Sequence, residues 1–297
     1  MFRKWGAQFR QLHPKPFQGV VSRLQLEGLS IGRLVTNCTV EIVGEKPRDS
    51  LAFGLVLHQQ DSSHFAHGTP LNTNCLFGFD PQREANLVSS AAGLSVVLVE
   101  VNKSLLQLFA NQLGHHELDD AFFRQNIVTA WPTHIDAYSS YLRQVIFLMD
   151  HHPQILQSPD LLRLIQGDLL PLLCNALSQP QQAPRPLRRA EIVAQAQDYM
   201  IANLHRPMTL AELSIAVHAS RRSLIYGFQD IFGMGPMAYL KQQRLNGVRQ
   251  ALLAADPEHA TVANIAHAWG FYSLGHFAHE YRCLFSEAPS ATLRHTT

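Results

Sequence analysis

The chain has 297 residues, of which 46% are hydrophobic and 16% are charged, and its formal net charge is +1. This composition predicts one to three folded domains with a sizeable core and excludes an extended disordered protein. The near-neutral charge gives no global signal for nucleic-acid binding, so any such function depends on where individual charges lie.

The amino-terminal segment and the cysteines indicate the compartment. MFRKWGAQFRQLHPKPF is basic but lacks an unbroken apolar stretch, which argues against a signal peptide. No apolar run reaches the length of a membrane span, so we expect no membrane partner. The four cysteines lack the spacing of a structural zinc site; they are Cys38, Cys75, Cys174 and Cys283. We interpret the chain as a cytoplasmic protein with reduced thiols.

Residues 1–101 are predicted to be rich in β-strands. Short runs with β-branched or aromatic residues alternate with Gly, Pro, Asn and Asp. The runs are VVSRLQLEG, SLAFGLVLH, NTNCLFGFD and LSVVLVEV. Strands at this spacing favour a sandwich or a small barrel.

Residues 102–178 change to a helical period. The segments NKSLLQLFANQLG, HIDAYSSYLRQVIFLMDHH and SPDLLRLIQGDLLPLLCNAL each place apolar residues three and four apart. These apolar faces could pack under the sheet or pair with another subunit. Residues 179–188 contain Pro180, Pro184 and Pro186, which predicts a semi-rigid linker. Residues 189–297 are expected to form a separate, all-helical domain.

Helix-start signals are clear in this last part. Thr209 with Glu212 is typical of a capping box, and Ser220 precedes an apolar-periodic run as an N-cap would. Arg221 and Arg222 follow in the first turn, where the helix dipole disfavours cations. We therefore expect an anion from outside the chain at this helix start.

A repeat with an offset of 53 residues joins two parts of the domain. The matched pairs are Ser220 with Ser273, Leu224 with Phe277, Phe228 with Tyr281, Ile231 with Leu284, Phe232 with Phe285, and Pro236 with Pro289. Such a repeat indicates one supersecondary unit used twice, here a helix, a tight turn and a second helix, with Ser220 and Ser273 as caps.

Each second helix is divided into two faces by the helical period. In the first unit the apolar stripe faces away from Arg222, Tyr226 and Gln229, and in the second it faces away from Gly275, His279 and Arg282. A recognition helix needs this division, because its back packs on the domain while its front enters the major groove. A connecting helix is expected from about Pro236 to Leu253, and two readers on one face of a duplex would lie about 34 Å apart.

From Arg189 to Arg294 the sequence resembles the DNA-binding domain of AraC/XylS-type transcription regulators. The stretches that carry this resemblance include SRRSL, GMGPMAYLKQQRLNGVR and GHFAHEYRCLFSEAPSATL, which look especially like those of the ethanolamine-operon regulator subgroup. The resemblance implies seven helices with two helix-turn-helix units that read adjacent major grooves. One departure is His218, which stands at a turn position where the family often has glycine.

The resemblance also implies roles for individual residues. Base-edge readers would be Arg222, Ile225 and Tyr226 in the first unit, joined on the same face by Gln229, and Leu274, Gly275, His276 and His279 in the second. Phosphate contacts would come from Arg221, Lys241, Arg244 and Arg282. Leu274 and Gly275 offer no side-chain hydrogen bond, so the second unit would contribute more to positioning or to thymine-methyl contact. From Arg188 onward, ten Lys and Arg against eight Asp and Glu give a net charge of only +2. Tight binding would then need a dimer on two half-sites.

For the first 178 residues the resemblance implies a cupin-like effector domain with dimerisation helices. The expected class is thus α+β and multidomain: a β-rich cupin-like domain over residues 1–101, helices over 102–178, a linker over 179–188 and a double helix-turn-helix domain over 189–297. The expected partners are promoter DNA, an unknown small-molecule effector and a second copy of the chain, with RNA polymerase as a further candidate. No cofactor is expected.

Two alternatives stay open at this level. One is a metal-dependent cupin enzyme, because His58, His64 and His67 lie close in sequence. Their spacing differs from the usual HxH with a later Glu, so polar surface is favoured over a metal or catalytic site. In GEKPRDS, Lys46 and Arg48 could meet an anionic effector, although an exposed turn is favoured. The other alternative is a DNA-binding dimer that binds no ligand.

Overall fold

A computed structural model describes residues 6–58, 64–178 and 185–294 of the chain. The chain forms two compact units, and each unit combines segments that are separated in the sequence. Unit 1 comprises residues 1–8, 19–37 and 42–185, and unit 2 comprises residues 9–18, 38–41 and 186–297. Two short amino-terminal segments therefore belong to the same unit as the carboxy-terminal helices, which the linear division at 179–188 did not anticipate.

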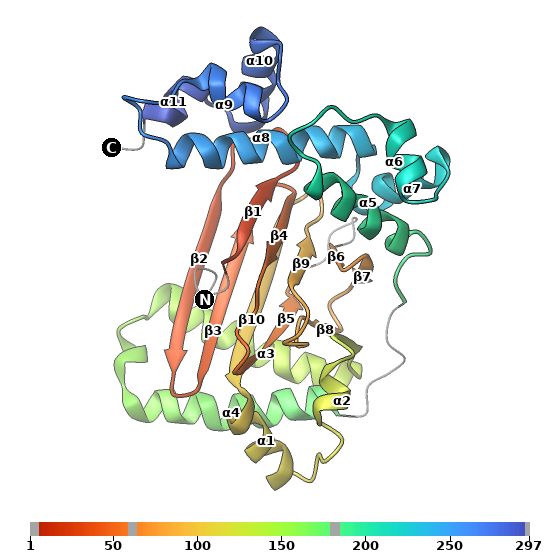
Figure 1. Cartoon of the computed structure of the whole chain (residues 1–297). Helices are drawn as coiled ribbons and strands as arrows, with labels where there is room; N and C mark the ends of the chain where they lie inside the picture. Colours follow the sequence, from red (N-terminus) through yellow and green to blue (C-terminus); the bar gives the residue numbers. More distant parts are fainter. Residues whose placement is uncertain (1–5, 59–63, 179–184, 295–297) are drawn as a thin grey trace. The chain divides into compact units, whose positions relative to one another are not determined.

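The strands form two sheets in the described part of the chain (Figure 1). The five-stranded sheet has the order β1-β4-β9-β6-β7, and the six-stranded sheet has the order β11-β8-β5-β10-β3-β2. The strands are β1 Gln8–Gln11, β2 Gly19–Leu26, β3 Leu29–Thr36, β4 Val40–Gly44, β5 Ser50–Val56, β6 His64–Ala66, β7 Thr69–Leu71, β8 Cys75–Phe77, β9 Ala85–Val88, β10 Leu94–Asn102 and β11 Ile127–Thr129. The β-rich expectation is confirmed, although β11 lies within the segment that was expected to be helical.

Strand β10 forms antiparallel ladders along both of its edges. It pairs with β3 from Leu94 opposite Thr36 to Val101 opposite Leu29, and with β5 on its other edge. Because strand residues alternate in direction, this register places β10 residues alternately on the two faces of the sheet.

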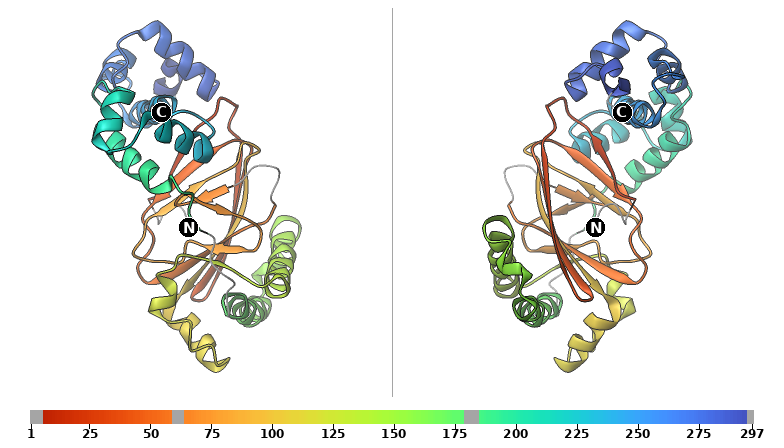
Figure 2. Two further views of the ribbon diagram at one scale, coloured as in Figure 1. Left: turned by 90° about the vertical axis from the view of Figure 1, so that its right-hand side faces the viewer. Right: turned by 90° about the vertical axis from the view of Figure 1, so that its left-hand side faces the viewer.

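The helices of unit 1 cover one face of the six-stranded sheet (Figure 2). They are α1 Lys103–Gln112, α2 Asp120–Phe123, α3 Pro132–His151, the short 3-10 helix Ile155–Gln157 and α4 Pro159–Leu177. Strand residues Ile31, Phe53 and Val99 share one buried cluster with Tyr138 of α3 and Leu169 of α4. The sequence left open whether the apolar helix faces pack under the sheet or pair with another subunit. In the structure they pack under the sheet.

The helices of unit 2 follow the expected order. They are α5 Ala190–Ala202, α6 Leu210–Ala216, α7 Arg221–Phe232, α8 Pro236–Ala254, α9 Val262–Ala268, α10 Leu274–Phe285 and α11 Pro289–Arg294. The connecting helix expected from Pro236 to about Leu253 is confirmed as α8. Leu245 and Val248 of α8 pack against Phe277, Tyr281 and Leu284 of α10. None of the helices in the described part of the chain is long and apolar enough to cross a membrane.

Candidate nucleic-acid interface

The first helix-turn-helix unit is formed by α6, a short turn and α7. Thr209 Oγ1 accepts a hydrogen bond from the Glu212 N–H at 3.2 Å, and Ser220 Oγ accepts one from the Ser223 N–H at 3.0 Å. The capping box is confirmed, because the Glu212 carboxyl also accepts from the Thr209 backbone. Arg206 first, then Tyr199 and this backbone bond, hold the pKa of Glu212 below its usual value.

The second unit is formed by α9, a turn one residue longer and α10. Ser273 occupies the N-cap position of α10, but its hydroxyl makes no capping hydrogen bond, so the expectation that it caps the helix is wrong. The backbone explains this difference. Its ψ is 96° at Ser273 against 147° at Ser220, so the side chain leaves the chain at another angle to the first-turn amides.

Four residues with a left-handed backbone conformation occupy corresponding positions in the two units. In each unit one lies in the turn and one at the end of the second helix. In the turns they are His218, with φ of 49°, and Gly270, with φ of 81°. At the ends of α7 and α10 they are Gly233, with φ of 69°, and Ser286, with φ of 59°. Each unit therefore uses glycine at one of the two points and an L-residue at the other, where the left-handed backbone is strained.

The apolar stripes of both second helices are buried as predicted. Leu224, Phe228, Ile231 and Phe232 of α7 are buried, as are Phe277, Tyr281, Leu284 and Phe285 of α10. The opposite faces, here called the outer faces, are exposed. They carry all of the predicted base readers: Arg222, Ile225, Tyr226 and Gln229 on α7, and Leu274, Gly275, His276 and His279 on α10. The structure thus brings each set together on one accessible helix face.

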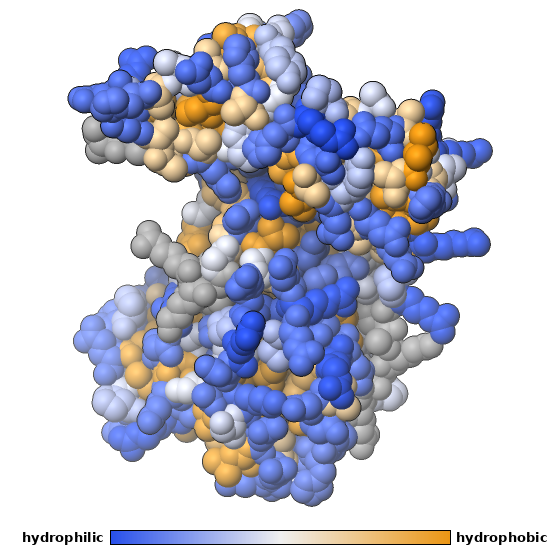
Figure 3. All heavy atoms as spheres, in the orientation of Figure 1, coloured by the Kyte–Doolittle hydropathy of each residue, from blue (hydrophilic) through white to orange (hydrophobic). Residues whose placement is uncertain are grey.

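Three arginines on the two second helices are exposed and have no acidic partner in the described part of the chain. Arg221, Arg222 and Arg282 are exposed, and within the described residues none of them forms an ion pair. Hydrophilic side chains predominate on the surface shown in Figure 3. An uncompensated arginine at a helix start, against the dipole, is suited to an anion supplied by a partner.

Tyr226 is held between two guanidinium groups. The Arg222 Cζ lies 5.3 Å from the Tyr226 ring centroid, and the Arg189 Cζ lies 5.4 Å from it. Arg189 also pairs with Asp230 at 3.4 Å. Arg189 precedes α5 and was not among the predicted site residues, because no local pattern links it to α7. These contacts restrict the rotamers of Tyr226 and Arg222 and so order the outer face.

The other two phosphate candidates have partners within unit 2. Lys241 Nζ binds Glu280 Oε1 at 2.7 Å. The Arg244 guanidinium donates to the carbonyl oxygen of Leu204 at 2.7 Å and to that of Arg206, and burial lowers its pKa. Arg244 thereby ties the α5–α6 loop to α8. The role of these two residues at phosphates stays a prediction.

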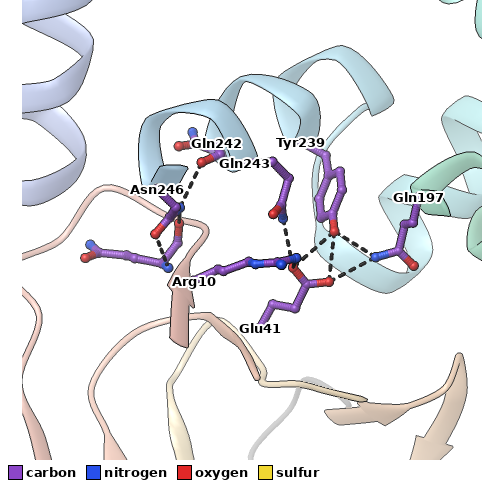
Figure 4. Close-up of polar contacts among 8 residues, drawn as sticks. Arg10, Glu41, Gln197, Tyr239, Gln242, Gln243 and Asn246 are labelled. Carbon is purple, nitrogen blue, oxygen red and sulfur yellow. Dashed lines mark hydrogen bonds and ion pairs between the residues drawn. The ribbon is translucent and has the colours of Figure 1, made fainter. Parts of the chain in front are cut away.

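A buried carboxylate joins the amino-terminal segments of unit 2 to its helices (Figure 4). The Glu41 side chain is fully buried and accepts from Tyr239 Oη at 2.8 Å, Gln243 Nε2 at 2.8 Å and Gln197 Nε2 at 2.9 Å, with the Arg10 guanidinium 3.5 Å away. We call these five residues the Glu41 cluster. Burial, then the Glu41 charge, raises the pKa of Tyr239, so the phenol stays protonated and donates.

A second contact fixes strand β1 to α8. The Asn246 side chain accepts from the Gln11 N–H at 3.0 Å and donates to the Gln11 carbonyl at 2.8 Å. Gln11 Nε2 in turn donates to the Leu284 carbonyl of α10 at 2.8 Å. The Glu41 cluster and this pair make residues 9–18 and 38–41 part of the helical unit, and neither was anticipated from the sequence.

The described histidines of the amino-terminal part have different environments and do not form a common site. His64 is buried in β6, and its Nδ1 accepts from the Ser90 N–H at 3.1 Å, so the expectation of a surface residue is wrong there. Burial, then Arg83 and Lys46, lowers the pKa of His67 to about 3, so its imidazole is neutral near pH 7. In the described ranges, no three His, Cys, Asp or Glu side chains are grouped so that they could hold a metal ion.

Comparison with known proteins identifies the helical domain. The sequence family described as "Helix-turn-helix domain" matches residues 213–295. A "Probable thc operon regulatory protein" of Rhodococcus erythropolis is 44% identical over 103 residues, which cover 35% of this chain and 31% of that protein. A solved structure, a probable AraC family transcriptional regulator of Rhodopseudomonas palustris, is 37% identical and aligns over 36% of this chain and 97% of its own, with a TM-score of 0.33. The carboxy-terminal domain belongs to the AraC/XylS family of transcription regulators.

Further curated relatives align with this domain. The XylDLEGF operon transcriptional activator of Pseudomonas putida is 36% identical over 92 residues, or 31% of this chain and 29% of that protein. The chain thus matches about a third of the length of these relatives.

Proposed function

We propose that the protein is a sequence-specific DNA-binding transcription regulator in which α7 and α10 are the recognition helices. The observation that carries this is the paired outer face, which places an uncompensated arginine and hydrogen-bonding side chains on each exposed second helix. Arg222 is suited to a guanine edge, because its guanidinium stacks on Tyr226 and is exposed. Arg221 and Arg282 are suited to phosphates, since they have no acidic partner in the described residues.

The two helices are proposed to contribute differently. The α7 outer face presents Arg222, Tyr226 and Gln229, which offer several donors and acceptors for direct readout. The α10 outer face begins with Leu274 and Gly275, which offer apolar contact only, followed by His276 and His279. In this proposal α7 supplies most of the base discrimination, while α10 fixes the position of the domain on the duplex.

Lys241 and Arg244 have a secondary part in this proposal. The Lys241 ammonium already pairs with Glu280, so a phosphate contact would have to compete with a partner at 2.7 Å. Arg244 uses donors on backbone carbonyls, and its main effect is to order the α5–α6 loop. We expect their substitution to weaken DNA binding less than that of Arg221 or Arg282.

We further propose that a small molecule controls this binding through unit 1, which we take to be a cupin-like domain. Its two sheets enclose an apolar cavity. The protein is proposed to act as a cytoplasmic homodimer without enzymatic activity, to contact RNA polymerase at its promoters, and to stand near the ethanolamine-operon regulators. The modest +2 charge of the domain supports the dimer, since few phosphates can be neutralised by one copy.

The direct test uses the full-length chain and the promoter region nearest its own gene. Nuclease protection should show two adjacent protected major-groove segments about one helical turn apart in each half-site. The double variant R221A/R282A should lose this protection at moderate salt, whereas Arg163→Ala, an exposed arginine of α4, should keep it. No protected segment at any salt concentration, with the protein folded by circular dichroism, would contradict the proposal.

A further inference from the structure

Unit 1 encloses an apolar cavity with four polar side chains in its wall. The cavity has a volume of about 40 Å³. Its apolar lining comes from both sheets and includes Leu34, Ile42, Phe77, Leu87, Val96 and Leu98. The polar side chains are Lys46, His67, Asn86 and Asn126. Since Lys46 was expected in an exposed turn, its burial in this wall is a correction: only 9% of its surface is exposed.

The Asn126 side chain has an unmet donor. Asn126 is 1% exposed, and its Oδ1 accepts from the Asp80 N–H at 3.0 Å and from Lys46 Nζ at 3.4 Å. Because both of these partners are donors, the amide orientation is fixed, and the Nδ2 group is the one that remains. This buried Nδ2 has no hydrogen-bond partner in the described structure. An acceptor at this end of the cavity would satisfy it.

The Lys46 ammonium lies at the same end of the cavity. Nζ donates to the Gly78 carbonyl at 3.0 Å and to Asn126 Oδ1, which uses two of its three protons. Burial lowers the pKa of Lys46 to about 8, with Asp80 raising it and Arg83 lowering it, so the group is still mainly charged near pH 7. A buried cation with only neutral carbonyl partners is stabilised by an anion.

Lys46 also lines an open cleft that carries a positive balance. The cleft has a volume of about 560 Å³. Its charged lining is Lys46, Arg48, Arg83 and Lys103 against Glu45 and Glu84. The lysine therefore stands in the wall of both spaces, with cations on its open side and aliphatic groups on its closed side. An anion attracted by the exposed Arg48 and Arg83 of the cleft would reach Lys46 in its wall, and an apolar body attached to the anion would enter the cavity behind Lys46.

We propose that Lys46 and Asn126 bind the carboxylate of a small monocarboxylic acid whose apolar body occupies this cavity. The proposal rests on the effector control proposed above and names its ligand class. The ammonium and the Asn126 Nδ2 each donate to the carboxylate, a charge-assisted pair in a water-poor site. Neutral His67 adds no competing charge. The cavity volume corresponds to about three water molecules and therefore favours an acid with a short chain. A longer acid would require the lining side chains to move apart.

Ligand binding to the full-length chain tests this inference. The probes are butanoate, hexanoate and octanoate, with hexan-1-ol, hexylamine and inorganic phosphate as comparisons at constant ionic strength, read by thermal shift and titration calorimetry. We expect saturable binding of at least one carboxylate, and no binding of the amine or of phosphate. Binding of the alcohol as tight as that of hexanoate would overturn the carboxylate assignment, and so would binding of phosphate alone.

Variants separate the anchor from a general effect on the domain. Lys46→Met should weaken carboxylate binding by about ten- to a hundredfold, the loss expected for one charge-assisted hydrogen bond. Asn126→Asp keeps a residue that tolerates the φ of 63° and should also weaken it, because it adds a negative charge. Lys103→Met, in the cleft but outside the cavity, should bind as the wild type does. Equal affinity in the wild type and Lys46→Met would refute the proposal.

The pH dependence gives a second readout. The affinity should be constant from pH 6 to 7 and fall by about tenfold per pH unit above about 8, as Lys46 loses its proton. The charged groups that act on the Lys46 ammonium are Asp80 and Arg83, and His67 lines the same cavity wall. An affinity that is flat to pH 10 would contradict the role of Lys46. Promoter protection without ligand is measured separately, so a failure of the ligand proposal leaves the DNA-binding result standing.

Discussion

At the scale of single residues, the two helix-turn-helix units differ by reciprocal substitutions at strained positions. The turn of the first unit has His218 where the second has Gly270, and the helix end of the second has Ser286 where the first has Gly233. A left-handed backbone costs an L-residue about 1–2 kcal/mol, of which glycine recovers only part, because it has more freedom in the unfolded chain.

We therefore expect His218→Gly and Ser286→Gly each to stabilise the protein by about 0.5–1 kcal/mol. Both side chains are exposed, so little packing is lost with them. Denaturant midpoints of the full-length variants measure the effect. His218→Ala and Ser286→Ala are the controls, since they remove the side chain and keep the strain. A gain in the alanine variants equal to that in the glycine variants would show that backbone strain is not the cause.

Single residues also show what sequence patterns cannot supply. The outer faces of α7 and α10 follow from local helical spacing, and every residue placed on them from the sequence is exposed there. Arg189, Glu41 and Asn126 were missed because their partners lie far along the chain; Glu41 contacts Tyr239 across 198 positions. Periodicity reports which face is buried, whereas it carries no information about which distant element covers that face.

At the scale of secondary-structure elements, α8 is the helix on which unit 2 is assembled. It receives the amino-terminal segments through Glu41 and Gln11, and it packs on α10 along its carboxy-terminal half. At Gly247 it also approaches the turn of the second unit so closely that a Cβ would lie 2.1 Å from the Trp269 ring. The spacing of the two recognition helices therefore depends on close packing along one helix.

Gly247→Ala should destabilise the protein by about 1–3 kcal/mol, because Trp269 would have to move out of its packed position. Gly275→Ala in α10 is the matched variant, since nothing lies within 4 Å of its Cβ. It should instead stabilise the helix by up to about 1 kcal/mol. Thermal unfolding of both variants checks this, and equal shifts of the same sign would contradict the packing argument.

The Glu41 cluster predicts that the buried carboxylate of strand β4 holds this segment against the helices of unit 2. Glu41→Ala leaves the buried donors of Tyr239 and Gln243 without their carboxylate acceptor, removes one of the two acceptors of Gln197 Nε2, and should cost about 3–5 kcal/mol. Glu45→Gln, an exposed change at the residue that follows β4, should stay within about 0.5 kcal/mol. Chemical denaturation measures both. Similar midpoints for the two variants would show that the buried carboxylate does not hold the segment.

At the scale of the whole molecule, the linear domain boundaries expected from the sequence describe only part of the organisation. The strand-rich part, the helices and the helical domain occur in the expected order, because local composition and period determine them. The division into compact units differs, since residues 9–18 and 38–41 belong with the helical domain. Strand β4 contributes Glu41 to unit 2 and Ile42 to unit 1, where Ile42 lines the apolar cavity. A fragment that starts at residue 185 would lack the partners of Tyr239 and Asn246, so functional tests require the full chain.

The most direct test of the recognition assignment is a base-preference profile of the full-length protein on randomised promoter DNA, at several salt concentrations. Arg222→Ala should lose about 1–3 kcal/mol of discrimination at one base position and keep its salt dependence. Arg282→Ala should weaken binding to all sequences alike and reduce the salt slope by about one. Identical profiles and identical salt slopes for the two variants would contradict the assignment of α7 as the base-reading helix.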